Sequence, residues 1–139
     1  MLFRSCIAIE ANPKAYGTNF LNRVPETEAF VRKVDHPAIR LIVDVGALQM
    51  GGDFDQIEAI AEQTRDVISH VHMSEPDLEP APADEKRAAR VLAALSRQGY
   101  RGACSIEMRA PEQAPMDILD RSVARLAAAA KMAEQAGKT

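Results

Sequence analysis

Two hydrophobic patterns alternate along the chain. Short apolar runs with a period of two residues, typical of β-strands, lie at about residues 5–10, 39–45, 67–73 and 103–108. Each run is followed by a polar loop and then by a longer stretch with apolar residues at helical spacing. This strict alternation predicts an α/β fold of four βα units around a parallel sheet with right-handed crossovers.

Each predicted helix carries one apolar stripe. Pro25 suits the first helical position, and Asp53 is placed to cap the second helix after a loop expected over residues 46–52. The stripes consist of Phe30, Val31 and Val34; Phe54, Ile57, Ile60 and Ala61; Ala88, Val91, Leu92 and Leu95; and Leu119, Val123, Leu126 and Ala130. The continuously apolar run at 39–45 is typical of a strand covered on both faces, which favours a parallel sheet.

The composition is that of an ordinary globular protein. The chain has 139 residues, 47% of them apolar, so we expect a single domain over residues 1–139. The formal charge is −3 and the 17 basic residues are scattered, which argues against a nucleic-acid partner. No apolar run approaches the ~20 residues that span a bilayer, so no membrane partner is expected.

The two cysteines bear on cellular location. Cys6 and Cys104 lie in apolar runs and lack CxxC spacing, so we expect structural thiols in a reducing cytosol. The first residues enter a strand pattern directly and lack the layout of a signal peptide. A cytoplasmic location is therefore expected.

Four polar residues lie at or near the carboxyl ends of the predicted strands. They are Glu10, Asp44, His72 and Glu107, spaced by roughly 30 residues, the length of one βα unit. They share strand parity, and the larger apolar residues occupy the opposite face. In TIM barrels the carboxyl-terminal rim of the strands carries the chemistry. We therefore expect these four side chains to meet at one end of the sheet.

A divalent metal ion is the simplest reason to gather three carboxylates and one imidazole. Without a cation these carboxylates would repel one another, and burying them unpaired is costly. A single acidic strand end is more often a helix cap or a salt-bridge partner, but four in register favour a metal. Oxygen-rich ligation with one histidine suits Mn²⁺, Mg²⁺ or Co²⁺ better than Zn²⁺.

Residues near these strand ends are candidates for substrate binding. His70 shares a face with His72 and can either bind substrate oxygens or be a hydrogen-bonded interior histidine. Arg109 shares the parity of Glu107 and can either meet an anionic or hydroxylated substrate or be a surface residue. Three loop residues are candidates of the same kind: Asn12, Tyr16 and Glu75.

Four motifs carry a family resemblance: Ile-Glu10-Ala-Asn-Pro, Val-Asp44-Val-Gly, His70-Val-His72 and Ser-Ile-Glu107-Met-Arg. Together they resemble the C-terminal half of a xylose isomerase-like TIM barrel, the superfamily of sugar phosphate isomerases and epimerases that includes the ketose 3-epimerases. In that family the fifth to eighth strands supply Glu, Asp, His and Glu to one metal ion. The resemblance covers nearly the whole chain and implies that Glu10, Asp44, His72 and Glu107 are metal ligands.

The resemblance also implies a reaction. A metal ion that bridges a substrate carbonyl and the neighbouring hydroxyl acidifies the adjacent C–H and stabilises an enediolate. By resemblance to the epimerases, Glu10 and Glu107 remove and return the proton. We therefore expect a metal-dependent isomerase or epimerase of a sugar or sugar phosphate; a hydride-shift isomerase stays open. Where relatives often have a histidine three residues after the metal aspartate, this chain has Ala47, which removes one substrate contact.

Length is the main departure from the family. A complete TIM barrel has ~250 residues, and only four βα units are found here. Four parallel strands alone leave two edges and an inner face uncovered. A second copy, a separate partner half-barrel or another association of a truncated chain can cover them. We expect a homodimer, because closed two-fold assemblies are common and remove both edges.

Two other functional classes compete with the enzyme. A non-catalytic half-barrel that keeps the ligand pattern is favoured by the missing half and by Ala47, whereas Glu10 and Glu107 favour the enzyme. An endonuclease-IV-like DNA repair protein uses a related barrel. Its trinuclear zinc site needs more histidines than the three in this chain, and a charge of −3 is wrong for a DNA groove binder.

Overall fold

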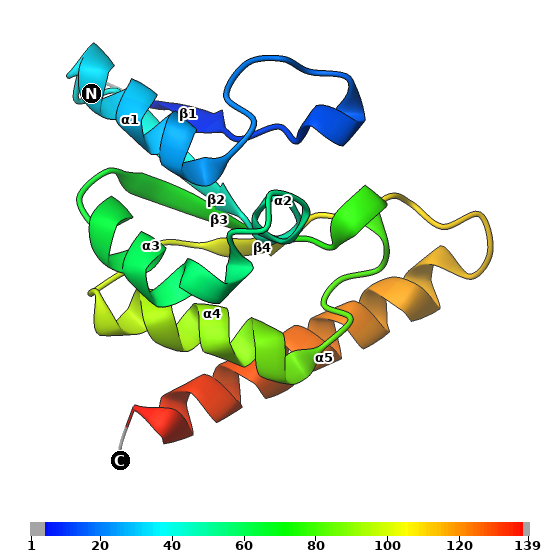
Figure 1. Cartoon of the computed structure of the whole chain (residues 1–139). Coiled ribbons are helices and arrows are strands. Elements are labelled where there is room, and N and C mark those ends of the chain that lie inside the picture. Colours follow the sequence, from blue (N-terminus) through cyan, green and yellow to red (C-terminus); the bar gives the residue numbers. More distant parts are fainter. Residues whose placement is uncertain (1–4, 138–139) are drawn as a thin grey trace.

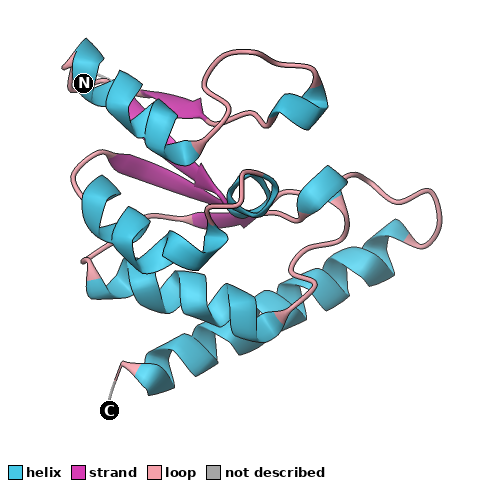
Figure 2. Ribbon diagram, viewed as in Figure 1, coloured by secondary structure: helices cyan, strands magenta, loops and turns pink. Residues whose placement is uncertain are grey.

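The computed structural model describes residues 5–137, which alternate between strands and helices around one sheet (Figures 1 and 2). The strands are β1 (Ile7–Glu10), β2 (Ile39–Asp44), β3 (Ile68–Met73) and β4 (Cys104–Ile106). The α-helices are α1 (Val24–Val34), α2 (Val45–Met50), α3 (Ile57–Thr64), α4 (Glu85–Arg97) and α5 (Pro115–Ala136). Short 3₁₀ helices are η1 (Lys14–Tyr16), η2 (Phe54–Gln56) and η3 (Pro76–Leu78). The predicted βα alternation is confirmed.

The sheet is parallel throughout and follows chain order, β1-β2-β3-β4. In register, Glu10 pairs with Ile42, Asp44 with His72, and His72 with Ser105. The carboxyl ends of all four strands therefore lie at one end of the sheet. This is the arrangement that the strand-end pattern predicted.

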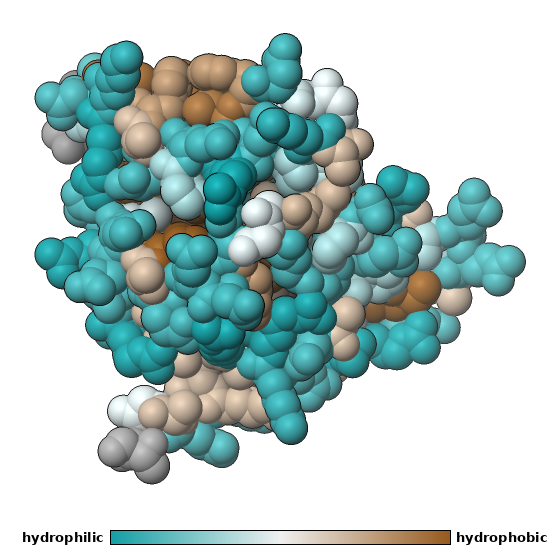
Figure 3. All heavy atoms as spheres, viewed as in Figure 1, coloured by the Kyte–Doolittle hydropathy of each residue, from teal (hydrophilic) through white to brown (hydrophobic). Residues whose placement is uncertain are grey.

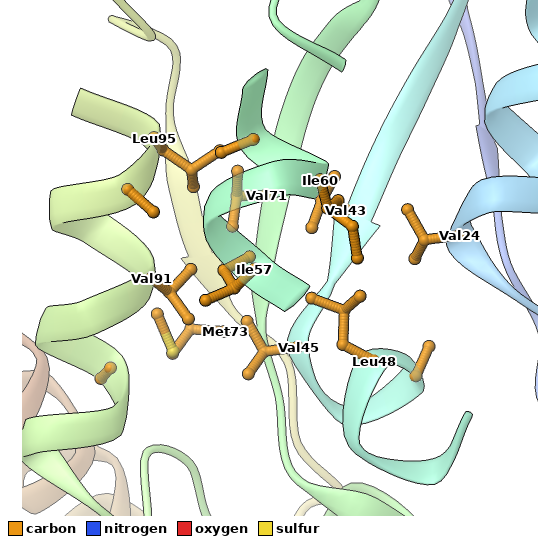
Figure 4. Close-up of a cluster of buried hydrophobic side chains, with 14 of the residues drawn as sticks. Val24, Val43, Val45, Leu48, Ile57, Ile60, Val71, Met73, Val91 and Leu95 are labelled. Carbon is orange, nitrogen blue, oxygen red and sulfur yellow. The ribbon is translucent and has the colours of Figure 1, made fainter. Parts of the chain in front are cut away.

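One face of the sheet is packed under the helices. Val43 and Val71 point from β2 and β3 into a buried cluster with Ile57 of α3 and with Val91 and Leu95 of α4 (Figure 4). All five are nearly or fully buried. The period-two alternation of the strands thus directs their β-branched residues outward to the helices and their polar residues to the opposite face.

The opposite face of the sheet is only partly covered. Ile42, His70 and His72 lie on it, and none of them is fully buried. Its two edges, β1 and β4, each have a single strand partner within residues 5–137. No helix in this part of the chain is both long and apolar enough to cross a membrane.

Apolar side chains are exposed beside both edges. Near β1, Ile7 is 63% exposed and Phe20 is 64% exposed, and Figure 3 shows apolar surface at the end of the molecule where β1 lies. Near β4, Leu119 and Val123 are exposed, although both belong to the predicted inward stripe of α5. That expectation is corrected because α5 packs mainly on α4 and runs past the edge of the sheet (Figure 1), where no further strand supports it. Val34, at the end of α1, is exposed as well.

Two expectations about the segment after β2 were wrong. Residues 46–52 were expected to form a loop, but α2 begins directly after the strand because the Asp44 side chain accepts a hydrogen bond of 2.6 Å from the Ala47 N–H. Asp53 was expected to cap the next helix, but it makes no such bond. Its carboxylate is buried and paired with Arg23, which lies in the loop after β1.

The cysteines are free, but only one is in a structural position. Cys104 packs against the core, whereas Cys6 is exposed just before β1. The expectation of two structural thiols is therefore corrected for Cys6. Strand β1 begins at Ile7, two residues later than predicted, which leaves this residue outside the sheet.

Candidate metal centre

The four predicted strand-end residues converge. Glu10 and Asp44 are the last residues of β1 and β2, His72 is next to last in β3, and Glu107 directly follows β4. Each offers one donor atom, and these four atoms all lie within 4.8 Å of one another. The cluster forms because parallel strands in sequential order bring their carboxyl ends to one end of the sheet.

His72 is at the centre of the cluster. Its Nδ1 atom lies 3.1 Å from Oε1 of Glu10 and 2.8 Å from Oε2 of Glu107. One ring nitrogen thus faces two carboxylates that reach it from the two outermost strands. A ring nitrogen has a single proton or lone pair to offer, so these two contacts compete for it unless a cation takes their place.

Asp44 is the most firmly held of the four. It is 7% exposed. Its Oδ1 atom accepts from the Ala47 N–H, and its Oδ2 atom accepts from the hydroxyl of Ser74. The Ser74 oxygen in turn accepts a bond of 2.8 Å from the Gly46 N–H. Each carboxylate oxygen keeps a second lone-pair direction, which leaves Asp44 able to bind a cation.

Burial, with a contribution from the neighbouring acidic groups, shifts the pKa values of two of these carboxylates upward. Burial raises the pKa of Glu10, and the charge of Asp44 raises it further, while His72 opposes both effects. Burial also raises the pKa of Asp44, against the hydrogen bonds from Ser74 and Ala47, which lower it. In both carboxylates burial outweighs the neighbouring groups that favour the ionised form.

The donor set suits a divalent ion. Three carboxylates and one neutral imidazole are typical ligands of Mn²⁺, Mg²⁺ or Co²⁺, and no cysteine approaches the cluster among the described residues. Bonds of about 2.1 Å to one ion place opposite donors about 4.2 Å apart. The observed spacing thus requires only small movements to match that geometry.

His70 lies on the same face as His72, one pleat further from the strand end. Its Nε2 atom is hydrogen-bonded to the hydroxyl of Ser105 on β4, and the two histidine rings are in edge contact, with centroids 5.1 Å apart. Burial lowers the pKa of His70, and His72 adds to this effect. The ring of His70 is hydrogen-bonded, as predicted for an interior histidine, and only partly buried, as a substrate-binding side chain requires.

A pocket of about 270 Å³ opens beside the cluster. Glu10, Asp44 and Glu107 line one side, and residues of the two neighbouring loops line the rest: Ala11, Asn12, Pro13, Tyr16, Glu75 and Leu78. The loop candidates Asn12, Tyr16 and Glu75 are thus brought to the pocket. Ala11 and Pro13 belong to the motif that begins at Ile9 and Glu10, whereas Leu78, also part of the apolar lining, had no recognisable signal in the sequence.

Glu75 holds the loop after β3 in place. This carboxylate is buried and accepts hydrogen bonds of 2.8 Å from the Ala83 N–H and 3.2 Å from the Gln49 side chain. The guanidinium of Arg87 lies 3.7 Å away. The loop 74–83 is therefore tied to both α2 and α4.

Arg109 does not line the pocket. Strand β4 ends at Ile106, so the parity that links Arg109 to Glu107 does not extend that far. Arg109 is exposed, and its backbone N–H donates a bond of 2.7 Å to the Leu78 carbonyl. Ala47 is buried in α2, where its N–H donates to the capping side chain of Asp44.

Solved structures of sugar epimerases share this fold. An L-ribulose 3-epimerase superposes with a TM-score of 0.80 at 16% identity, over 96% of this chain and 50% of that chain. A 3-keto-D-glucoside 4-epimerase from E. coli gives 0.75 at 17% identity, over 87% and 45%. A D-psicose 3-epimerase from Clostridium cellulolyticum H10 gives 0.66 at 16% identity, over 92% and 48%. At these identities the likeness shows the fold alone.

The chain spans about half the length of these solved relatives. Its four βα units therefore correspond to half of a barrel, as the sequence predicted. No curated protein sequence matches the chain. Residues 6–134 match the family described as xylose isomerase-like TIM barrel. The chain therefore belongs to the xylose isomerase-like TIM barrel family.

Proposed function

We propose that this chain is the metal-binding half of a sugar isomerase or epimerase. The observation that carries the proposal is the convergence of Glu10, Asp44, His72 and Glu107 within 4.8 Å at the carboxyl ends of four parallel strands. Family membership and the fold shared with sugar epimerases support it. The substrate is a small carbohydrate.

These four residues are the proposed ligands of Mn²⁺, Mg²⁺ or Co²⁺. When bound, such an ion polarises a substrate carbonyl and stabilises the negative charge that develops on its oxygen. Asp44, fixed by two hydrogen bonds, and His72, central to the cluster, hold that position. Three carboxylates also explain why the cation is needed, because they otherwise repel one another.

Glu10 and Glu107 are the proposed acid and base. They reach the cluster from the first and last strands and both line the pocket. When a substrate lies between them, one carboxylate can reach its C–H and remove the proton. The other carboxylate can then return a proton to the opposite face of the resulting enediolate. Asn12 and His70 are proposed to bind substrate hydroxyls. Arg109 is also proposed to bind substrate, which requires its loop to turn toward the pocket.

A second half-barrel is proposed to complete the active site. The two open edges, each flanked by exposed apolar side chains, support this assembly. Two copies of this half-barrel domain close the sheet when β4 of each pairs with β1 of the other, which removes both edges. Light scattering at micromolar concentration tests the homodimer, and a monomer under these conditions contradicts it.

We also propose that the protein is located in the reducing cytoplasm, because both of its cysteines are free thiols.

Metal binding is the test of the proposed function. A ligand that binds only the native state must stabilise it, by about 2.7 kcal/mol at a hundred times its Kd. We expect Mn²⁺ to raise the melting temperature of the wild type and to have little effect on Glu107→Gln. Glu112→Gln, in the exposed loop after β4, is the matched control and keeps the full response. A wild type that Mn²⁺ leaves unstabilised contradicts the proposal.

Turnover separates the enzyme from a non-catalytic half-barrel. A panel of free and phosphorylated ketoses is incubated with the Mn²⁺-loaded protein, and solvent deuterium incorporation is followed by NMR. Proton exchange at the carbon next to the carbonyl, lost in Glu10→Gln, supports an enediolate route. Metal binding with no exchange on any sugar favours the non-catalytic alternative, for which the replacement of a family histidine by Ala47 is the specific observation.

A further inference from the structure

Ser74 is a buried hydroxyl next to the metal cluster that contributes no ligand to it. It directly follows β3, two residues after His72, and is 1% exposed. Its hydroxyl donates to Oδ2 of Asp44, and its oxygen accepts the Gly46 N–H at 2.8 Å. A hydroxyl has one proton, so with Gly46 as donor to the oxygen, that proton is directed at Asp44.

This contact restricts the rotation of the Asp44 carboxylate. The Ala47 N–H holds Oδ1 at 2.6 Å, and a single bond to one oxygen leaves the group free to rock about that contact. The Ser74 bond to the second oxygen removes that freedom. The plane of the carboxylate is thus set before any cation binds, next to the other three residues of the cluster.

Gly46 makes the approach of Ser74 possible. A Cβ atom at this position would lie 2.9 Å from the Ser74 hydroxyl oxygen and 2.9 Å from the Glu75 carbonyl oxygen. Both distances are shorter than real Cβ contacts, and the Glu75 carbonyl belongs to a loop fixed by its buried side chain. Any side chain at position 46 therefore forces Ser74 away from Asp44.

We propose that Ser74 is a positioning residue that orients Asp44 for the divalent ion, and that Gly46 is required for this contact. The inference rests on the proposed metal centre. Removing a hydrogen bond of this kind from a ligating carboxylate typically weakens metal binding about 10- to 100-fold. Ser74 is expected to act through Asp44 alone, without touching the ion or the substrate.

Mn²⁺ affinity measures this role directly. The free Mn²⁺ signal is titrated by electron paramagnetic resonance with the full chain, far below its melting temperature, where a general loss of stability does not change affinity. Ser74→Ala is expected to bind Mn²⁺ roughly 10- to 100-fold more weakly than the wild type. Ser69→Ala is the matched control, since Ser69 lies in β3, the strand that Ser74 follows, and its hydroxyl donates to the Leu41 carbonyl at 3.3 Å. It is expected to keep wild-type affinity.

Gly46→Ala provides a second variant that keeps the serine. It is expected to weaken Mn²⁺ binding as Ser74→Ala does, whereas Gly137→Ala, whose added Cβ meets only ordinary contacts of 3.7 Å or more, leaves binding unchanged. If either folded variant, Ser74→Ala or Gly46→Ala, binds Mn²⁺ as tightly as the wild type, the positioning role is overturned while the metal centre stands. If the wild type itself binds no Mn²⁺, the metal centre is overturned, and the inference with it.

Discussion

The phenol oxygen of Tyr16 lies 3.0 Å from the backbone nitrogen of Asp77 and accepts its hydrogen bond. The bond joins the loop after β1 to the loop after β3, and both loops border the pocket. Asp77 and its neighbour Leu78 have φ values of 59° and 56°, a left-handed conformation that is costly outside glycine. The Tyr16 contact therefore stabilises the strained segment that forms one wall of the pocket.

Removing this acceptor is expected to loosen the two loops without unfolding the domain. In Tyr16→Phe the Asp77 N–H is left to water, which costs at most about 1 kcal/mol because the site is exposed. Hydrogen exchange should accelerate in residues 74–83 and stay slow in β3. Tyr100→Phe, which removes the bond to the Ala103 carbonyl, is the matched control and should change exchange only around residue 103. Faster exchange across β3 in Tyr16→Phe would contradict this local role.

The ion pair between Arg23 and Asp53 predicts an order of stabilities. Asp53 is 1% exposed, whereas the Arg23 side chain is 48% exposed. Arg23→Met leaves a buried carboxylate without a partner, so it should lower the melting temperature more than Asp53→Asn, which costs about 1 kcal/mol. The double variant should be more stable than the sum of the two effects predicts, because the sites are coupled. Thermal unfolding of the four proteins measures this. Additive effects would show that the pair is not coupled.

Asp66 is expected to contribute to acid sensitivity. Two hydrogen bonds from Arg32, of 2.8 and 2.9 Å, hold the pKa of this carboxyl at about 2, below its usual value of 3.8. Because the folded-state pKa is depressed, the stabilisation is complete above pH 4 and is lost as the pH falls toward 2. Asp66 is 59% exposed, so solvent limits the effect to less than about 1 kcal/mol. Asp66→Asn should therefore flatten the pH dependence of unfolding between pH 4 and 2, and 1 M salt should reduce the difference.

The two cysteines should react at different rates. Cys104 is partly buried, and burial raises its pKa to about 11, so little thiolate forms at pH 8. Cys6 is exposed. Iodoacetamide should label Cys6 first, as peptide mass spectrometry can show. Equal rates would contradict the packing of Cys104 against the core.

Cys104 can also report on assembly. It lines an apolar groove of about 570 Å³ under α5, together with Ile106, Leu119 and Val123, at the open β4 edge. A half-barrel that pairs with β4 is expected to slow Cys104 labelling further as protein concentration rises. If the labelling rate of Cys104 does not depend on protein concentration where light scattering detects a dimer, the dimer contact lies away from the β4 edge.

Much of the fold could be predicted because strand and helix periods differ clearly in this chain. The positions of Glu10, Asp44, His72 and Glu107 followed from one rule, that sequential parallel strands end on the same side. Each of these residues lies at or beside a strand end, where an error of one residue in the predicted strand boundary hardly changes the position of the side chain. This tolerance explains why the cluster was predicted although β1 and β4 are shorter than expected.

The errors concern which partner a side chain meets in the folded protein. Asp53 resembled a helix cap locally, but Arg23, thirty residues earlier, binds it instead. Asp44 was predicted to be a metal ligand in preference to a helix cap, yet its side chain also caps α2 by accepting from the Ala47 N–H. The stripe of α5 was correct as a pattern, but the part of the chain that the structure describes has no strand next to β4 for Leu119 and Val123 to cover. The hydrophobic pattern identifies the apolar face of a helix, whereas the tertiary fold determines which residues pack against that face.

Two of the four proposed ligands, Glu10 and Glu107, lie at the ends of the outermost strands, and β2 and β3 separate them in the sheet. Their meeting at His72 thus depends on how strongly the sheet curves. A partner that pairs with the open edges sets that curvature, and an ion held by all four residues sets it as well. If the proposed closure and the proposed metal binding both occur, they are thermodynamically linked: the factor by which closure changes metal affinity equals the factor by which the metal changes closure.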